Sequence, residues 1–185
     1  VQFMPFNRSL HRVSPQMVQQ TAAFAGSANA TQKSFAERWI LPYAMIVAYG
    51  VTNEFSARTT GMSPDDFKNL LKALWLGTAE LNTHSKMGHD PMLLLVVENR
   101  SGHKIGALQR MIRMTGRQVE DTAIRNSDQF SIDFSVLLDA IQENGKVIAT
   151  RIMQNKRLCS KDGDNQADVY DLMTQRGIKA EKLEF

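Results

Sequence analysis

A segment between Ser63 and Asn82 constrains the fold of this chain more than any other, because its pattern is that of an amphipathic helix. Ser63 is a preferred N-cap residue, and Pro64 suits the first helical position. Asp65 and Asp66 follow, where negative charge favours the positive end of the helix dipole. Apolar residues then recur at helical spacing: Phe67, Leu70, Leu71, Leu74, Trp75 and Leu81. The pattern predicts a helix with one apolar stripe that ends near Asn82.

Strand-like segments flank this helix. Residues 39–52 are strongly apolar, which is typical of a strand that is buried on both faces. A polar loop at 83–90 and a strand at 92–98 follow the helix. Residues 1–6 read as a short strand. Residues 7–37 show no sustained periodicity and predict an irregular insertion.

A second strand–helix–strand unit follows later in the chain, with a strand at 130–134, a helix at 136–141 and a strand at 147–153. A polar loop at 158–166, a helix at 167–176 that stops at Gly177, and a weak strand at 178–185 complete the chain. Repeated units of this kind favour an α+β fold, an RRM-like or ferredoxin-like antiparallel sheet with helices on one face plus inserted loops. We expect a single domain over residues 1–185, with the irregular insertion at about 7–37.

Composition excludes several classes of protein. The apolar fraction of 43% in 185 residues rules out a wholly disordered chain, and no apolar run approaches the roughly 20 residues of a membrane helix. The lone Cys159 excludes an internal disulfide framework and a Cys-rich zinc site, and predicts a cytoplasmic location. The chain opens on Val1 rather than methionine, so we expect it to begin inside a longer protein.

The net charge of +3 is unevenly distributed. Residues 1–40 hold four cations and one acid, and residues 101–129 hold five cations and three acids. Guanidinium forks, hydroxyls and ammonium groups suit phosphate oxygens, and they gather in two places. One group is Arg8, Ser9, His11 and Arg12, and the other is Thr83, Ser85 and Lys86.

Patterns for catalysis are weaker. His84 and His89 are five residues apart with Asp90 adjacent, whereas a helical zinc pair needs a spacing of three or four. Cys159 has no convincing catalytic partner in the sequence, and Asp133 and Asp139 show no sign of converging. A phosphate-binding P-loop and a dinucleotide glycine fingerprint are both absent from the sequence.

Several short segments occur in one order that is similar to a known family. They are Val1-Gln-Phe, Arg8-Ser-Leu-His-Arg-Val13, Leu41-Pro-Tyr-Ala44, Tyr49-Gly50, Thr60-Gly61, Ala73-Leu-Trp-Leu-Gly-Thr78, Leu81-Asn-Thr83, and Ser85-Lys86-x-Gly88-x-x-Pro91-x-Leu-Leu-Leu95. Together they resemble the CRISPR-associated backbone subunit of the type I Cascade complex, most like its type I-B branch. The resemblance is dense from residue 1 to about 110 and thin afterwards. The family normally begins with a further strand and turn, so the resemblance implies that an N-terminal region is missing.

The resemblance implies a subunit without catalytic residues, metal or cofactor that polymerises along a guide RNA (crRNA). Its partners would be the crRNA, target DNA by way of the guide, adjacent copies head to tail and other Cascade subunits, with no membrane. A thumb-like hairpin or loop would interrupt the paired bases, and residues 16–33 would lie near RNA or a neighbouring copy. Carried over by match, the RNA-binding residues would be Arg8, Ser9, His11, Arg12, Lys33, Thr83, His84, Ser85 and Lys86.

Two alternatives remain open from the sequence. Relatives in the same superfamily cleave RNA with a loop aspartate, and no matching aspartate is found in this chain. The other alternative is a ferredoxin-like domain that binds a metal or small molecule at His84, His89 and Asp90.

Overall fold

The chain folds into helices and several small sheets. The computed structural model describes residues 8–9, 16–23, 33–40, 45–81, 89–120 and 123–185, and the first three ranges are described by their backbone alone. The helices are α1 (Glu54–Thr60), α2 (Pro64–Ala79), α3 (Ser135–Glu143) and α4 (Val169–Gln175), with short 3-10 turns η1 (Leu108–Arg110) and η3 (Ser127–Gln129). The strands are β1 (Arg8–Ser9), β2 (Gln16–Ala23), β3 (Lys33–Ile40), β4 (Ile46–Val47), β5 (Leu93–Asn99), β6 (Arg113–Thr115), β7 (Ser131–Asp133), β8 (Val147–Gln154), β9 (Ser160–Asp162), β10 (Asn165–Gln166) and β11 (Ala180–Lys182).

Two larger sheets form the body. One has the order β11-β8-β5, in which β5 is antiparallel to β8 and β11 is parallel to it. The other has the order β10-β9-β7-β6 and contains one parallel pair, β7 with β9. The predicted α+β class is therefore confirmed. The sheets themselves are mixed, whereas the sequence predicted an antiparallel sheet.

The hydrophobic core lies within the second half of the chain. Its buried members are Ile124, Phe130, Ile132, Phe134, Leu137, Leu138, Ile141, Ile152, Leu158, Val169, Leu172, Met173 and Ile178. Six of these thirteen come from the alternation in and beside β7 and from the apolar stripe of α3, as the periodicity predicted. The predicted stop at Gly177 is also confirmed, since α4 ends at Gln175, shortly before Gly177, whose φ of +71° favours glycine.

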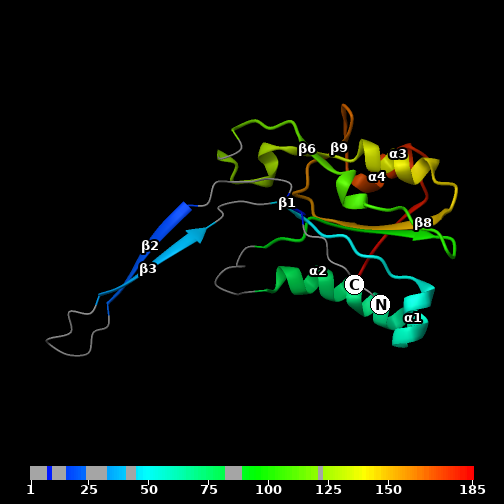
Figure 1. The fold of residues 1–185 in the computed structure, drawn as a ribbon. Helices are drawn as coiled ribbons and strands as arrows, with labels where there is room; N and C mark the ends of the chain where they lie inside the picture. The colour runs from blue at the N-terminus through cyan, green and yellow to red at the C-terminus, as the bar shows by residue number, and fades with distance from the viewer. Residues whose placement is uncertain (1–7, 10–15, 24–32, 41–44, 82–88, 121–122) are drawn as a thin grey trace.

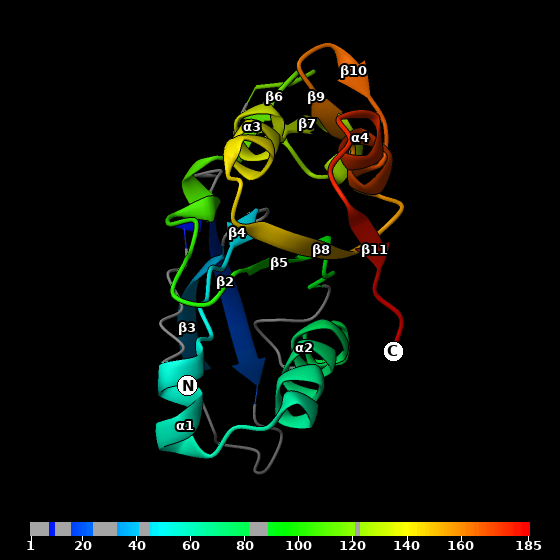
Figure 2. The same ribbon diagram turned by 90° about the vertical axis from the view of Figure 1, so that its right-hand side faces the viewer.

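Helices lie on both sides of the β11-β8-β5 sheet. Figure 2 shows α3 and α4 on one side of that sheet and α1 and α2 on the other. The prediction that all helices cover one face is therefore incorrect in this detail. Among residues 45–81, Leu71 alone is buried. The apolar stripe of α2 was predicted from the sequence, but the face of the sheet on which α2 lies was not.

The N-terminal strands differ most from the expectation. β2 and β3 pair antiparallel over eight residues each, from Gln16 opposite Ile40 to Ala23 opposite Lys33, and form a ribbon that projects from the body (Figure 1). The prediction of an irregular insertion is wrong for these two strands. The predicted long strand at 39–52 is also wrong, because β4 has only two residues and Ile46 is 55% exposed. The predicted strand at 1–6 lies outside the described residues.

The predicted α2 is confirmed with its cap. The Ser63 hydroxyl accepts a hydrogen bond from the Asp66 amide at 3.1 Å, and the Asp66 carboxylate accepts one from the Ser63 amide at 2.9 Å. Hydrogen bonds from the Ser63 amide and hydroxyl lower the pKa of Asp66 below its ordinary value. Such reciprocal bonds satisfy two amide donors that the helix itself leaves unpaired.

We expect Ser63→Ala to reduce the free energy of unfolding by about 1 kcal/mol, because the cap bond to the Asp66 amide is lost. Urea titration followed by circular dichroism measures the change. A lowered carboxyl pKa contributes stability that is present above the unfolded-state value and is lost as the pH falls through the folded-state value. The cost of Ser63→Ala should therefore shrink in strong acid. An equal cost at neutral and strongly acidic pH would contradict the charged capping box.

Candidate nucleic-acid interface

The structure places part of the predicted RNA-binding set. Arg8 and Ser9 form β1, whose backbone pairs with β4 at Val47 and Ile46. Lys33 begins β3 in the projecting ribbon, opposite Ala23. The remaining predicted residues, His11, Arg12, Thr83, His84, Ser85 and Lys86, lie outside the described residues. Their role therefore stays a prediction.

A tertiary hydrogen bond joins the β1–β4 pair to a basic segment far along the chain. Shortly after β4, the Tyr49 hydroxyl donates to the Ile105 carbonyl at 3.0 Å. Burial raises the pKa of Tyr49, so its hydroxyl keeps the proton that it donates. The contact holds the extended segment after β4 against the loop that follows β5.

That loop belongs to a basic stretch, residues 99–119, which contains no aspartate or glutamate. Its cations are all exposed: Arg100, Lys104, Arg110, Arg113 and Arg117. The surplus of charge over residues 101–129 was visible in the sequence, but its connection to β1 and β4 through Tyr49 was not. The candidate interface thus combines two basic segments that are far apart in sequence.

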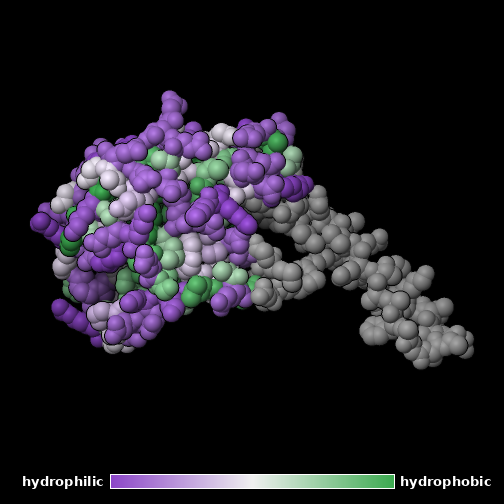
Figure 3. Space-filling model, turned by 180° about the vertical axis from the view of Figure 1, so that it is seen from behind, coloured by the Kyte–Doolittle hydropathy of each residue, from purple (hydrophilic) through white to green (hydrophobic). Residues whose placement is uncertain are grey.

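A large hollow lies between α2 and β5. Its volume is about 2140 Å³, and apolar residues of α2 and β5 line its interior, among them Phe67, Trp75 and Leu95. Hydrophobic side chains are visible between hydrophilic ones on the back of the molecule (Figure 3). Basic residues also line the hollow: Arg100, His103, Lys104, Arg125, Arg151, Lys156 and Arg157.

One end of the hollow is lined by residues 89–92. The turn between β8 and β9 lies against residues 90–92 there, because the Asn155 amide donates to the Met92 carbonyl at 2.9 Å. Arg157 Nη1 lies 2.7 Å from Asp90 Oδ2 in this turn. Lys156 and Arg157 could not be predicted from the sequence, since only the tertiary contact reveals their position beside residue 90.

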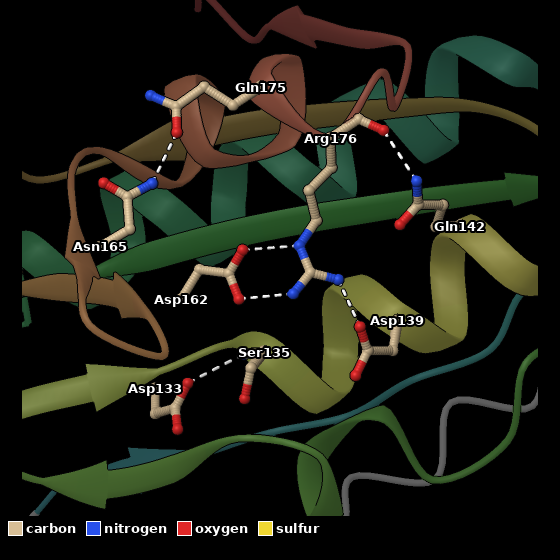
Figure 4. A network of polar contacts seen from close by, with 8 residues as sticks. All are labelled: Asp133, Ser135, Asp139, Gln142, Asp162, Asn165, Gln175 and Arg176. Carbon is tan, nitrogen blue, oxygen red and sulfur yellow. Dashed lines mark hydrogen bonds and ion pairs between the residues drawn. The ribbon is translucent and has the colours of Figure 1, made fainter.

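Asp139, one of the two aspartates considered for catalysis, belongs to an ion-pair network. Arg176 makes a two-pronged contact to Asp162, with Nε–Oδ2 and Nη2–Oδ1 distances of 2.5 Å, and Nη1 donates to Asp139 (Figure 4). The two carboxylates raise the pKa of the Arg176 guanidinium through these hydrogen bonds. This network ties α4 to α3 and β9.

The Asp133 side chain accepts a hydrogen bond from the amide of the first residue of α3. Burial acts to raise the pKa of Asp133, but hydrogen bonds outweigh it and the pKa is lowered, chiefly through the Ser135 amide at 2.9 Å. Cys159 is partly exposed and makes no disulfide. Within the described part of the chain, three or more His, Cys, Asp or Glu side chains nowhere gather as metal ligands. His84 lies outside that part, so the alternative site at His84, His89 and Asp90 is not placed.

The longest described helix, α2, has 16 residues, and no helix in the described ranges has the length and apolar character that crossing a membrane requires.

Fold and interface together define an α+β protein with a projecting two-stranded ribbon and exposed basic loops. The model of the family described as CRISPR-associated protein Cas7 matches residues 1–135, and the chain belongs to this family. It is thus a backbone subunit of a CRISPR effector complex, in a family whose members bind crRNA and other Cascade subunits. The predicted family is confirmed, while the type I-B assignment stays a prediction. No curated protein matched the chain.

Proposed function

We propose that this Cas7 subunit binds the backbone of a guide RNA (crRNA), polymerises head to tail along it, and presents it for pairing with target DNA. The observation that carries this proposal is the acid-free basic stretch at 99–119, joined through Tyr49 and Ile105 to the strand pair that contains Arg8 and Ser9. Basic side chains on loops suit phosphates, which every RNA sequence presents alike.

Head-to-tail assembly follows from the same chemistry. A strand of repeating phosphates offers the same site many times, so successive copies of one subunit can occupy it in register. Contacts between such copies are heterologous and produce an open array rather than a closed dimer. The β2–β3 ribbon projects from the body and is the element that we assign to a neighbouring copy or to the RNA.

RNA affinity measured over a series of salt concentrations tests the backbone mode. We expect the logarithm of the binding constant to fall linearly with the logarithm of salt, by about 0.7 per phosphate contact, and to depend little on guide sequence. A flat salt dependence, or strong preference for one sequence, would contradict backbone recognition. Protein purified from its own host should also carry RNA of discrete length.

We place the subunit in the cytoplasm and propose that it does not cleave RNA. Incubating the purified protein with RNA and divalent metal ions tests the second statement. Intact RNA over many hours supports a purely structural subunit, whereas regular cuts along the strand would establish a ribonuclease instead.

A further inference from the structure

We propose that the turn at residues 155–157, between β8 and β9, binds a phosphodiester group of the nucleic acid beside His89 and Asp90. The inference rests on the proposed function, because it adds a contact to the same interface. Neither the sequence pattern nor the family resemblance pointed to these residues. Three observations carry it: the rigidity of the turn, the unbalanced positive charge on it, and its position.

Asn155 fixes the turn at both of its ends. Its amide donates to the Met92 carbonyl at 2.9 Å, and its side-chain Nδ2 donates to the Pro91 carbonyl at 3.3 Å. Asn155 Oδ1 accepts from the Arg157 amide at 3.0 Å, and the Asn155 carbonyl accepts from the amide of buried Leu158 at 3.0 Å. The two cations between these contacts are therefore held on a preorganised backbone.

The turn carries more positive charge than its surroundings neutralise. Lys156 is exposed and makes no ion pair with any described residue. The Arg157 side chain is 71% exposed, and its contact to Asp90 uses Nη1. A guanidinium has five N–H donors, so Arg157 retains donors for a phosphate while Asp90 holds its orientation. Arg125 and Asp128 also line the hollow, but their opposite charges cancel, so together they add no net charge near the turn.

The position of the turn connects it to the predicted RNA site. Antiparallel pairing of β5 with β8 places Gln154 opposite Leu93, so the end of β8 meets the start of β5. His89 follows Lys86 by three residues, and an extended chain of that length spans at most about 11 Å. One nucleic-acid strand can therefore reach both. An acidic peptide of a protein partner could bind the turn without also reaching Lys86, so the short distance between the two favours a nucleic-acid strand.

The test replaces both cations of the turn, Lys156→Ala with Arg157→Ala, and measures binding of single-stranded RNA of several sequences over a salt series. We expect the affinity to fall about 10- to 30-fold on every sequence. The salt slope should become less steep by about 1.4, which corresponds to two lost contacts. Lys156→Ala alone keeps the Arg157 contact to Asp90, and should give about half of the change in slope.

A matched control removes the same charge at the other end of the sheet. Lys146→Ala with Lys179→Ala changes two exposed cations that directly precede β8 and β11, outside residues 99–119 and outside the lining of the hollow. Leu93 and Asn99, the two end residues of β5, are six residue steps apart, a distance of about 20 Å along the strand. We expect the control to change RNA affinity less than 3-fold. Equal losses in both double variants would mean diffuse attraction and would overturn the site.

Two arms distinguish the source of the phosphate. One uses free protein and guide RNA, and the other uses protein already loaded with guide RNA and a complementary DNA strand. A loss in the first arm assigns the turn to the guide, and a loss only in the second assigns it to target DNA. If wild-type protein binds and the double variant matches it in both arms, the turn is not a phosphate site. If wild-type protein binds neither RNA nor DNA, the proposed function itself fails.

Discussion

RNA affinity should fall about 100-fold, on every guide sequence tested, when Arg12 and Lys86 are both replaced by alanine. Each side chain is predicted to donate charge-assisted hydrogen bonds to phosphate, and such a bond contributes about 1.5–3 kcal/mol. Losing two contacts should also reduce the salt slope by about 1.4 for a single strand. Filter binding or fluorescence anisotropy over a salt series measures both quantities.

The matched control for this double variant is Lys68→Ala with Lys72→Ala. Both lysines are exposed on α2, and the charge change is identical. Because these lysines stand on a helix that we do not assign to the interface, we expect less than a 3-fold change. A strong loss on one RNA sequence with none on another would point to base recognition, and would count against a subunit that grips the strand regardless of sequence.

The largest expected loss of stability comes from Arg176→Ala. This substitution leaves the Asp162 carboxylate, whose side chain is only 15% exposed, without its guanidinium partner. Removing one member of a mostly buried ion pair costs about 2–4 kcal/mol, because the remaining charge stays desolvated. In a chain of this length the melting temperature should fall by about 5–10 °C. Differential scanning calorimetry gives the value directly.

Two comparisons make the Arg176 result specific. Arg176→Lys keeps the charge but cannot make two parallel bonds to Asp162, so we expect an intermediate loss. Arg151→Ala removes a guanidinium that is 37% exposed and paired with Glu98, and should cost less than about 1 kcal/mol. Equal costs for Arg151→Ala and Arg176→Ala would mean that the network in Figure 4 contributes no more than a surface pair.

Elements with a clear apolar face or apolar run were predictable from the sequence. α2, α3, β5, β7 and β8 have a clear periodicity or apolar run, and each was predicted near its observed bounds. Their patterns survive because burial selects residue type at fixed spacing. The same reasoning predicted the stop of α4 at Gly177.

Elements that are stabilised mainly by backbone hydrogen bonds or by helix caps were not predicted from the sequence. The sequence of β2, Gln16–Ala23, is mostly polar or small, and its two larger apolar residues, Met17 and Val18, are adjacent, so it shows no alternation. Its order comes from pairing with β3. α1 has seven residues and none is buried, and its N-cap is a bond from the Ser56 amide to Asn53. β9 was predicted as loop, although Ser160 is buried and donates to the Ala167 carbonyl at 2.6 Å.

The candidate site was predicted only in part for a related reason. Residue types suitable for phosphate can be read from sequence, as with Arg8 and Arg12. Which of them gather on one surface depends on contacts between distant segments, such as Tyr49 with Ile105 or Asn155 with Pro91. Such contacts leave no periodic pattern, so Lys156 and Arg157 could not be assigned from the sequence.

The division of the molecule around the hollow has a consequence for its motions. Among the residues whose side chains are described, nearly all fully buried ones lie after residue 120, whereas Leu71 is the single buried side chain in the stretch 45–81. Local opening of α2 therefore costs less free energy than global unfolding, and its amide hydrogens should exchange with solvent long before those of α3. Assembly that covers the hollow would slow amide hydrogen exchange in α2 selectively. Exchange in α3 and α4 would stay unchanged, so complex formation would be detected in one half of the subunit only.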